Sequence, residues 1–120
     1  LEVLLLGKAL KHIDFSEDGR IAWMSLPYDE VKSINALDFH PEGIINYTRM
    51  ITGVEVGLLF RETEPGVVKI GFRSKGPINV AAIAQEFNGG GHRQAAGARQ
   101  EGRLEEVREQ VIKMVKDVIS

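Results

Sequence analysis

The chain has 120 residues, of which 43% are apolar and 27% charged, so it is long enough for one globular domain with a single hydrophobic core. It contains no cysteine, which excludes disulfides and thiolate metal sites, and no apolar run approaches the ~20 residues of a membrane-spanning helix. A formal net charge of -2 gives no general affinity for nucleic acid, and we expect a soluble cytoplasmic domain without a membrane partner.

The first half of the sequence predicts short helices around one strand. The spacing of apolar and turn residues indicates a helix over residues 1–13, a strand over residues 20–26, and helices over residues 28–34 and 42–50. The first helix starts without a capping residue, so we expect it to be the end of a longer element. Trp23, within the strand, is expected in the core rather than in a base-stacking site.

The middle of the chain predicts a β-hairpin. Alternating apolar residues indicate strands over residues 54–61 and 68–73, joined by a turn at residues 64–66. The period of two places Lys69 and Arg73 on one face of the second strand, with only Gly71 between them. A ligand could therefore approach the backbone closely at Gly71.

The last third of the chain predicts two helices and a short strand. Asn79 is a good N-cap for a helix that runs to Phe87, and Asn88 and Gly89 can end that helix in left-handed geometry. A short strand is expected over residues 98–101, before an amphipathic helix that should dock on a sheet. Together these elements predict an α/β fold: a single domain with a small mixed β-sheet and helices packed on it.

Three successive glycines, residues 89–91, are followed by His92 and Arg93. Residues 66–100 hold five cations and one acid, whereas the other 85 residues hold ten cations and sixteen acids. Glycines allow successive N–H groups to converge into an anion-binding nest, and a helical turn beginning near His92 would add its dipole at the same point. The ligand expected at such a site is a phosphate.

The end of the hairpin supplies similar chemistry, because Arg73, Ser74 and Lys75 offer a guanidinium, a hydroxyl and an ammonium group. Each feature alone has a structural explanation: a triple glycine is often a loop or a tight crossing, and charged residues at a strand end are often solvated. Their coincidence in one cationic window favours a phosphate site. His12 and His40 have no acidic or histidine neighbours at ligand spacing, and we assign them no site.

The segments 72–75 (FRSK) and 89–97 (GGGHRQAAG), with the apolar helix between them, resemble the C-terminal substrate-binding domain of the DHH phosphoesterase family. The most similar branch is the bifunctional oligoribonuclease and pAp phosphatase type, which is exopolyphosphatase-related. Two positions depart from the family pattern: Asn88 stands where many members have a fourth glycine, and Gly71 where a small polar residue is common. Neither change affects a residue expected to bind phosphate.

The resemblance implies that residues 1–15 are the truncated end of an interdomain linker helix and residues 16–120 the DHH-associated C-terminal domain. It also implies an N-terminal DHH catalytic domain in the same polypeptide, with a manganese or magnesium centre. The Asp-His-His motif does not occur in this sequence, so no catalytic residue and no metal are expected in this chain. Oligomeric state is not fixed by the resemblance, and a homodimer stays open.

The whole enzyme is expected to hydrolyse short RNA or a phosphorylated nucleotide such as pAp. This domain would face the metal centre across an interdomain cleft and hold the substrate phosphate. The family motifs assign phosphate binding to Arg73, Ser74, Gly89, Gly90, Gly91 and His92, with Lys75 and Arg93 as weaker candidates.

Two other interpretations stay open at this point. Related glycine-rich domains occur at the C-terminus of alanyl-tRNA synthetase, where the work is RNA binding without hydrolysis, and the gene sequence upstream would distinguish the two. A purely structural module is the third interpretation. In that case His92→Ala and Arg73→Ala would destabilise the fold and leave every ligand affinity unchanged.

We predict that the 120-residue chain by itself does not hydrolyse pAp, because the metal ligands of the family are not in its sequence. The measurement is release of phosphate from pAp in the presence of Mn²⁺. Metal-dependent turnover by the purified chain would contradict this prediction.

Overall fold

The computed structural model describes residues 2–34 and 42–119, so His40 of the sequence analysis lies outside the described residues. Its elements are, in chain order, α1 (Glu2–Lys11), β1 (Asp14–Phe15), β2 (Ile21–Leu26), α2 (Tyr28–Ser33), α3 (Glu42–Ile45), the 3₁₀ helix η1 (Asn46–Met50), β3 (Val56–Glu64), β4 (Val67–Ser74), α4 (Val80–Gln85), β5 (Gly90–His92), β6 (Ala95–Glu101) and α5 (Leu104–Ile119).

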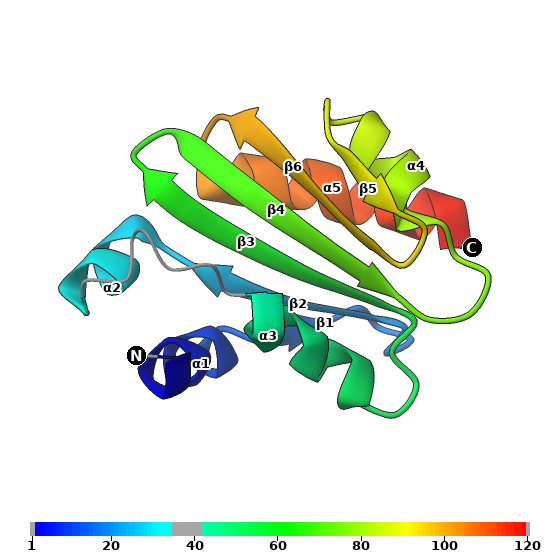
Figure 1. Cartoon of the computed structure of the whole chain (residues 1–120), viewed down its shortest axis with the longest axis horizontal. Helices are drawn as coiled ribbons and strands as arrows, with labels where there is room; N and C mark the ends of the chain where they lie inside the picture. The colour runs from blue at the N-terminus through cyan, green and yellow to red at the C-terminus, as the bar shows by residue number, and fades with distance from the viewer. Residues whose placement is uncertain (1, 35–41, 120) are drawn as a thin grey trace.

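The strands form one six-stranded sheet in the order β1-β2-β3-β4-β6-β5 (Figure 1). Strands β2 and β3 are parallel, and every other neighbouring pair is antiparallel. The sheet is therefore mixed, with helices packed on it, which confirms the predicted α/β fold. Strand β5 is the edge next to β6, and β1 is the opposite edge.

One face of the sheet packs against α4 and α5; in Figure 1, α5 passes behind β6 and β5, and α4 lies beside β5. Alternate residues of β3 and β4 point into this layer, among them the fully buried Leu58, Phe60 and Phe72. The stripe expected on the last helix meets them there, since Val107 and Val111 of α5 are buried in the same cluster. The prediction that this helix docks on a sheet is confirmed.

On the other face of the sheet, helices cover the half formed by β2 and β3 and leave the half formed by β4, β6 and β5 open. Helices α1, α2 and α3 bury a second apolar cluster against β2 and β3, in which Leu5, Ile45 and Leu59 meet. In Figure 1, α3 lies in front of the sheet near β2 and β3, whereas β4, β6 and β5 face the viewer. Gly97 and Arg99 of β6 are exposed on this side. This half-covered face is where a ligand has room to approach.

Several local predictions are confirmed. The Asn79 side chain accepts a hydrogen bond from the Ala82 N–H and caps α4. Asn88 adopts φ 61°, the left-handed geometry expected at the end of that helix. Trp23 is partly buried and packs against the first cluster.

Other boundaries differ from the prediction. The helix expected over residues 42–50 is α-helical only to Ile45 and continues as the 3₁₀ helix η1, where the Thr48 hydroxyl bonds back to the Ile45 carbonyl. The strand expected over residues 98–101 begins earlier, at Ala95, because it pairs along most of β4. Residues 14 and 15 add a short strand, β1, that the sequence did not suggest.

Helix α1 packs on the domain through Leu5 and Ala9, both fully buried. The division into a linker at residues 1–15 and a domain from residue 16 stays a prediction. Within residues 2–34 and 42–119, no helix is long and apolar enough to cross a membrane.

We predict that Gly57→Ala lowers the free energy of unfolding by about 1–3 kcal/mol, the usual cost of overpacking. A Cβ at Gly57 would lie 2.5 Å from the Thr48 Cβ, because η1 packs directly on β3 at this point. Gly7→Ala is the matched control: nothing lies within 4 Å of a Cβ there, and alanine favours the helix by about 1 kcal/mol. Equal denaturation midpoints for the two variants would contradict this account.

Candidate functional site

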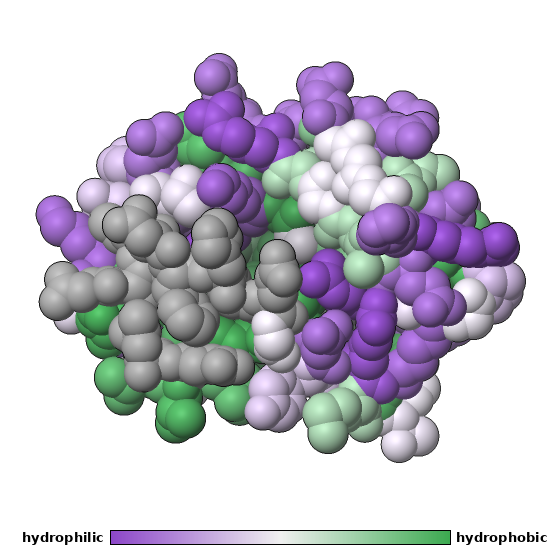
Figure 2. All heavy atoms as spheres, in the orientation of Figure 1, coloured by the Kyte–Doolittle hydropathy of each residue, from purple (hydrophilic) through white to green (hydrophobic). Residues whose placement is uncertain are grey.

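A cavity of about 480 Å³ opens on the half-covered face of the sheet, over β4, β6 and β5. Ile45 of α3 and Leu59 of β3 form one wall, and the β5–β6 hairpin forms the other. Figure 2 shows this face, where pale and light-green residues meet purple polar ones around a central hollow. The cavity therefore lies between the second apolar cluster and the glycine-rich hairpin.

The floor of the cavity is a row of glycines. Gly71 of β4 lies directly opposite Gly97 of β6, which lies directly opposite Gly90 of β5. Residues directly opposite in antiparallel pairs share a face of the sheet, so the three glycines form one row across three strands. We call this the glycine row. The Ile45 side chain covers Gly71, where a Cβ would lie 2.8 Å from Ile45 Cδ1, whereas no side chain lies within 4 Å of a Cβ at Gly97 or Gly90. A flat ligand can therefore lie against the backbone over Gly97 and Gly90.

Cationic residues lie on both sides of the glycine row. On one side, Arg73 of β4 is opposite Ala95 of β6, which is opposite His92 of β5. On the other side, Arg61 of β3 is opposite Lys69 of β4. Arg61, Lys69, Arg73 and His92 all line the cavity, whereas Arg99 of β6, which lies opposite Lys69, does not. The cavity thus has a flat floor between two positively charged ends.

Arg61 differs from the other cations in its burial. Only 7% of it is exposed, and burial lowers the pKa of its guanidinium group because the charged form loses solvation. The surrounding β3 residues Leu59 and Phe60 are buried as well. A charge in such a site has a stronger electrostatic effect on a nearby anion than one in bulk water has.

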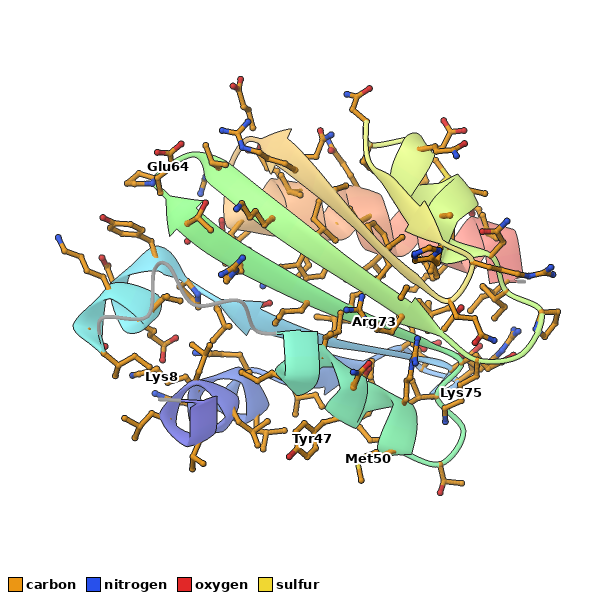
Figure 3. All side chains as sticks on the ribbon, viewed as in Figure 1. Lys8, Tyr47, Met50, Glu64, Arg73 and Lys75 are labelled. Atoms are coloured by element: carbon orange, nitrogen blue, oxygen red, sulfur yellow. The ribbon has the colours of Figure 1, made fainter. Side chains whose placement is uncertain are left out.

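Half of the predicted site residues line the cavity: Arg73, Gly90, Gly91 and His92. Figure 3 shows Arg73 on the viewer's side of β4, beside the helical segment that contains η1. Its guanidinium donates a hydrogen bond to the Phe72 carbonyl at 2.9 Å. The structure therefore brings the two motifs of the sequence analysis together, although 15 residues separate Ser74 from Gly90 along the chain.

The other four predicted residues lie outside the cavity lining. The Ser74 hydroxyl is buried and donates to the Ile78 carbonyl at 2.7 Å, and the Lys75 ammonium donates to the Ile51 carbonyl at 3.2 Å. Arg93 is exposed and donates to the Pro77 carbonyl at 3.1 Å. The Gly89 N–H donates to the Ala84 carbonyl at 2.9 Å and so closes α4. These residues hold the loops beside the cavity.

The prediction of a helical turn near His92 is wrong. His92 belongs to β5, where Gly91 pairs with Ala96 and His92 with Ala95. The physical reason is that the small residues after the turn extend β6, and an edge strand pairs with it more favourably than an isolated turn would form. His92 therefore reaches the cavity as a side chain on a strand, without a helix dipole.

The three glycines have different structural roles. A Cβ at Gly89 would lie 2.1 Å from the Gly97 carbonyl oxygen, and one at Gly91 would lie 2.6 Å from the Ala96 Cα. Gly91 also has φ 145°, which side-chain-bearing residues rarely adopt. Nothing lies within 4 Å of a Cβ at Gly90. The close approach of β6 therefore requires glycine at positions 89 and 91. No packing contact requires glycine at position 90.

Arg49 of η1 was not among the predicted site residues. Its guanidinium donates to the Gln94 carbonyl in the β5–β6 turn, so it connects η1 with the hairpin. Its Nε is buried, and within the described part of the chain it has no hydrogen-bond partner. A buried donor of this kind is costly when it stays unpaired, which makes a nearby acceptor favourable.

The sequence analysis also missed Arg61 and Gly97. Arg61 could have been found from the sequence, because it is an arginine at the end of a mostly apolar strand. The predicted turn at residues 64–66 brings that position opposite Lys69. Gly97 carried no such signal, because its alignment with Gly71 depends on the pairing of β4 with β6.

The described residues contain no group of three or more histidine, aspartate or glutamate side chains that could hold a metal ion. His12, which we assigned no site, lies against Glu30. Among the described residues, the lining of the cavity offers guanidinium, ammonium and imidazole groups, which suit an anion.

We predict that Gly90→Ala changes the free energy of unfolding by less than about 1 kcal/mol, whereas Gly91→Ala lowers it by more than about 2 kcal/mol. Only Gly91 combines a backbone clash with a left-handed φ. Urea denaturation of the two variants is the measurement. If both glycines prove equally intolerant, the hairpin packs differently from this structure.

Comparison with known proteins identifies two relatives that are each 29% identical to this chain. The chain is 29% identical over 96 residues to the bifunctional oligoribonuclease and PAP phosphatase NrnA of Bacillus subtilis, a match that covers 80% of this chain and 30% of that protein. It also resembles the crystal structure of an exopolyphosphatase-related protein from Bacteroides fragilis, with a TM-score of 0.82, 29% identity, and coverage of 98% of this chain and 33% of that one. The chain thus spans about a third of the length of these relatives.

A more distant structure shares the fold alone. The C-Ala domain of Aquifex aeolicus alanyl-tRNA synthetase superimposes with a TM-score of 0.60 and 11% identity, over 89% of this chain and 98% of that domain.

The family model of the DHHA1 domain matches residues 41–120, which include the hairpin, the glycine run and every strand from β3 onward. The chain therefore belongs to the DHHA1 domain family, the DHH-associated family that its FRSK and GGGH segments indicate.

Proposed function

We propose that this chain is the substrate-binding domain of a DHH-family phosphoesterase and that it holds a phosphorylated nucleotide or short oligoribonucleotide in the cavity over β4, β6 and β5. The observation that carries the proposal is the glycine row between cationic residues on one open face of the sheet. A flat floor suits a base or ribose, and the cations suit phosphate oxygens.

Arg73 and His92 are the phosphate-binding side chains in this proposal. They come from β4 and β5, and both line the same end of the cavity with only Ala95 of β6 between them in the register. A guanidinium binds a phosphate through two parallel hydrogen bonds, and an imidazole N–H adds a third donor from the other side. Two donors that converge from separate strands fix the position of the phosphate as well as its charge.

Ser74, Lys75, Gly89 and Arg93 have a supporting role in the proposal. Their hydrogen bonds go to the carbonyls of Ile78, Ile51, Ala84 and Pro77. These bonds fix the segments that flank Arg73 and His92. Preorganisation of this kind lets a binding group act without first paying the entropy of ordering.

The hydrolytic chemistry is proposed to reside in a DHH domain of the same polypeptide. A manganese or magnesium centre there would supply the activated water, while this chain orients the phosphate toward it. The relatives' printed names, an oligoribonuclease and PAP phosphatase and an exopolyphosphatase-related protein, agree with a phosphate ester or anhydride as substrate. The likeness to the C-Ala domain concerns the fold alone and gives the RNA-binding alternative no separate support.

We predict that Arg73→Gln and His92→Gln each weaken binding of pAp by the full-length protein about 10- to 100-fold. This is the range expected when one charge-assisted hydrogen bond, worth about 1.5–3 kcal/mol, is lost. Isothermal titration with pAp is the measurement, and thermal unfolding of each variant checks that the fold is kept.

Arg99→Gln is the matched control, because Arg99 is an exposed arginine of β6 that lies outside the cavity lining and forms an ion pair with Glu64. The affinity of this variant for pAp should stay within about twofold of wild type. Unchanged affinity in Arg73→Gln, or an equal loss in Arg99→Gln, would show that the cavity is not the binding site.

A further inference from the structure

The two walls of the cavity belong to separate parts of the chain. Ile45, at the end of α3, lies in one wall, and the β5–β6 hairpin with His92 forms the other. Arg49 follows Ile45 on η1, and its guanidinium donates a hydrogen bond to the Gln94 carbonyl in the turn between β5 and β6. Arg49 is outside the cavity lining. Its hydrogen bond therefore joins the two walls without entering the cavity.

The η1 end of this connection is fixed on the sheet. Thr48, the residue before Arg49, is buried, and its hydroxyl donates to the Ile45 carbonyl at 2.7 Å. It packs so closely on Gly57 of β3 that a Cβ there would lie 2.5 Å from the Thr48 Cβ. Close packing of this kind allows little relative movement, so η1 holds Arg49 at a fixed position relative to β3.

The hairpin end of the connection lies between the two residues proposed to bind phosphate. The Gln94 carbonyl also accepts a hydrogen bond at 3.1 Å from the N–H of Ser74, the residue after Arg73. Gln94 is itself two residues from His92. Two other side-chain hydrogen bonds of the turn end at carbonyls of the loop between β4 and α4. Arg49 adds a connection from the opposite wall, so it fixes the distance between that wall and His92.

The stability of the fold does not explain a guanidinium at this position. The Arg49 Nε is buried and has no hydrogen-bond partner among the residues that the structure describes, and an unpaired buried donor costs free energy. If Arg49 were replaced, the Gln94 carbonyl would keep the Ser74 N–H as its donor. An apolar side chain of similar length, such as methionine, would thus remove the unpaired donor without leaving that carbonyl unpaired.

We propose that Arg49 is a positioning residue, which holds the hairpin to η1 and thereby sets the position of His92 relative to Arg73. The inference rests on the proposed function and deepens it. With the hairpin fixed, the two side chains converge on one phosphate before the ligand arrives, so binding does not include the entropic cost of ordering the hairpin. Without the bond, the edge strand β5, which pairs on one side only, can shift.

The test is a titration of the full-length protein with pAp in two backgrounds, wild type and His92→Gln. In the wild-type background Arg49→Met should weaken binding about 5- to 10-fold, because preorganisation of the hairpin is lost. In the His92→Gln background the same substitution should change affinity by less than about twofold, because the residue through which Arg49 acts is already replaced. The midpoint of thermal unfolding of Arg49→Met should stay within about 2 °C of wild type.

Arg108→Met is the matched control. Arg108 is also a half-buried arginine that joins two elements, since it donates to the Ser25 hydroxyl at 3.0 Å and connects α5 with β2, outside the cavity lining. Its loss removes a donor from a buried hydroxyl, so Arg108→Met should lower the unfolding midpoint. Its affinity for pAp should stay within about twofold of wild type.

Three results would overturn the inference: Arg49→Met binds pAp as wild type does, it weakens binding by the same factor with and without His92, or its unfolding midpoint falls as far as that of Arg108→Met. In each case, weaker pAp binding by Arg73→Gln would leave the proposed function standing. If the wild-type protein does not bind pAp, the proposed function fails and the inference fails with it.

Discussion

The register of β4 against its neighbours is the constraint on which the rest of the structure depends. Val68, Ile70 and Phe72 are buried against α4 and α5, so the intervening residues must face the opposite side. A slip of one residue would exchange the two faces and expose the core. Burial of three apolar side chains on one face therefore places Lys69, Gly71 and Arg73 on the other, in the cavity.

The same constraint explains why the glycine run is more than a loop. Strand β6 approaches β5 so closely that Gly89 and Gly91 have no room for a Cβ, and this close approach aligns Gly90 with Gly97 and Gly71. The entropic cost of the run is thus offset in part by packing. The structural role belongs to Gly89 and Gly91 and the proposed binding role to Gly90, and this separation lets mutations tell the two roles apart.

Much of the local structure was predictable, because its causes lie within a few residues. Asn79 caps α4 through its own side chain, and Asn88 ends that helix with a left-handed φ that asparagine tolerates. Prediction failed where the local structure depends on pairing with a strand that the local sequence does not identify. The segment around His92 is a strand because Ala95 and Ala96 pair with it, and nothing within the glycine run itself indicates that partner.

The sequence by itself determined the α/β class, the hairpin, the face shared by Lys69, Gly71 and Arg73, and the family to which the chain belongs, since periodicity, turn residues and motif spacing are local properties. Only the tertiary structure decided which candidates meet. It brought Arg73 and His92 to one end of a cavity and placed Arg61 in the cavity lining. It also directed the Ser74 hydroxyl to the Ile78 carbonyl, away from the cavity. Strand order and helix coverage depend on contacts between residues far apart in the chain, which no local pattern encodes.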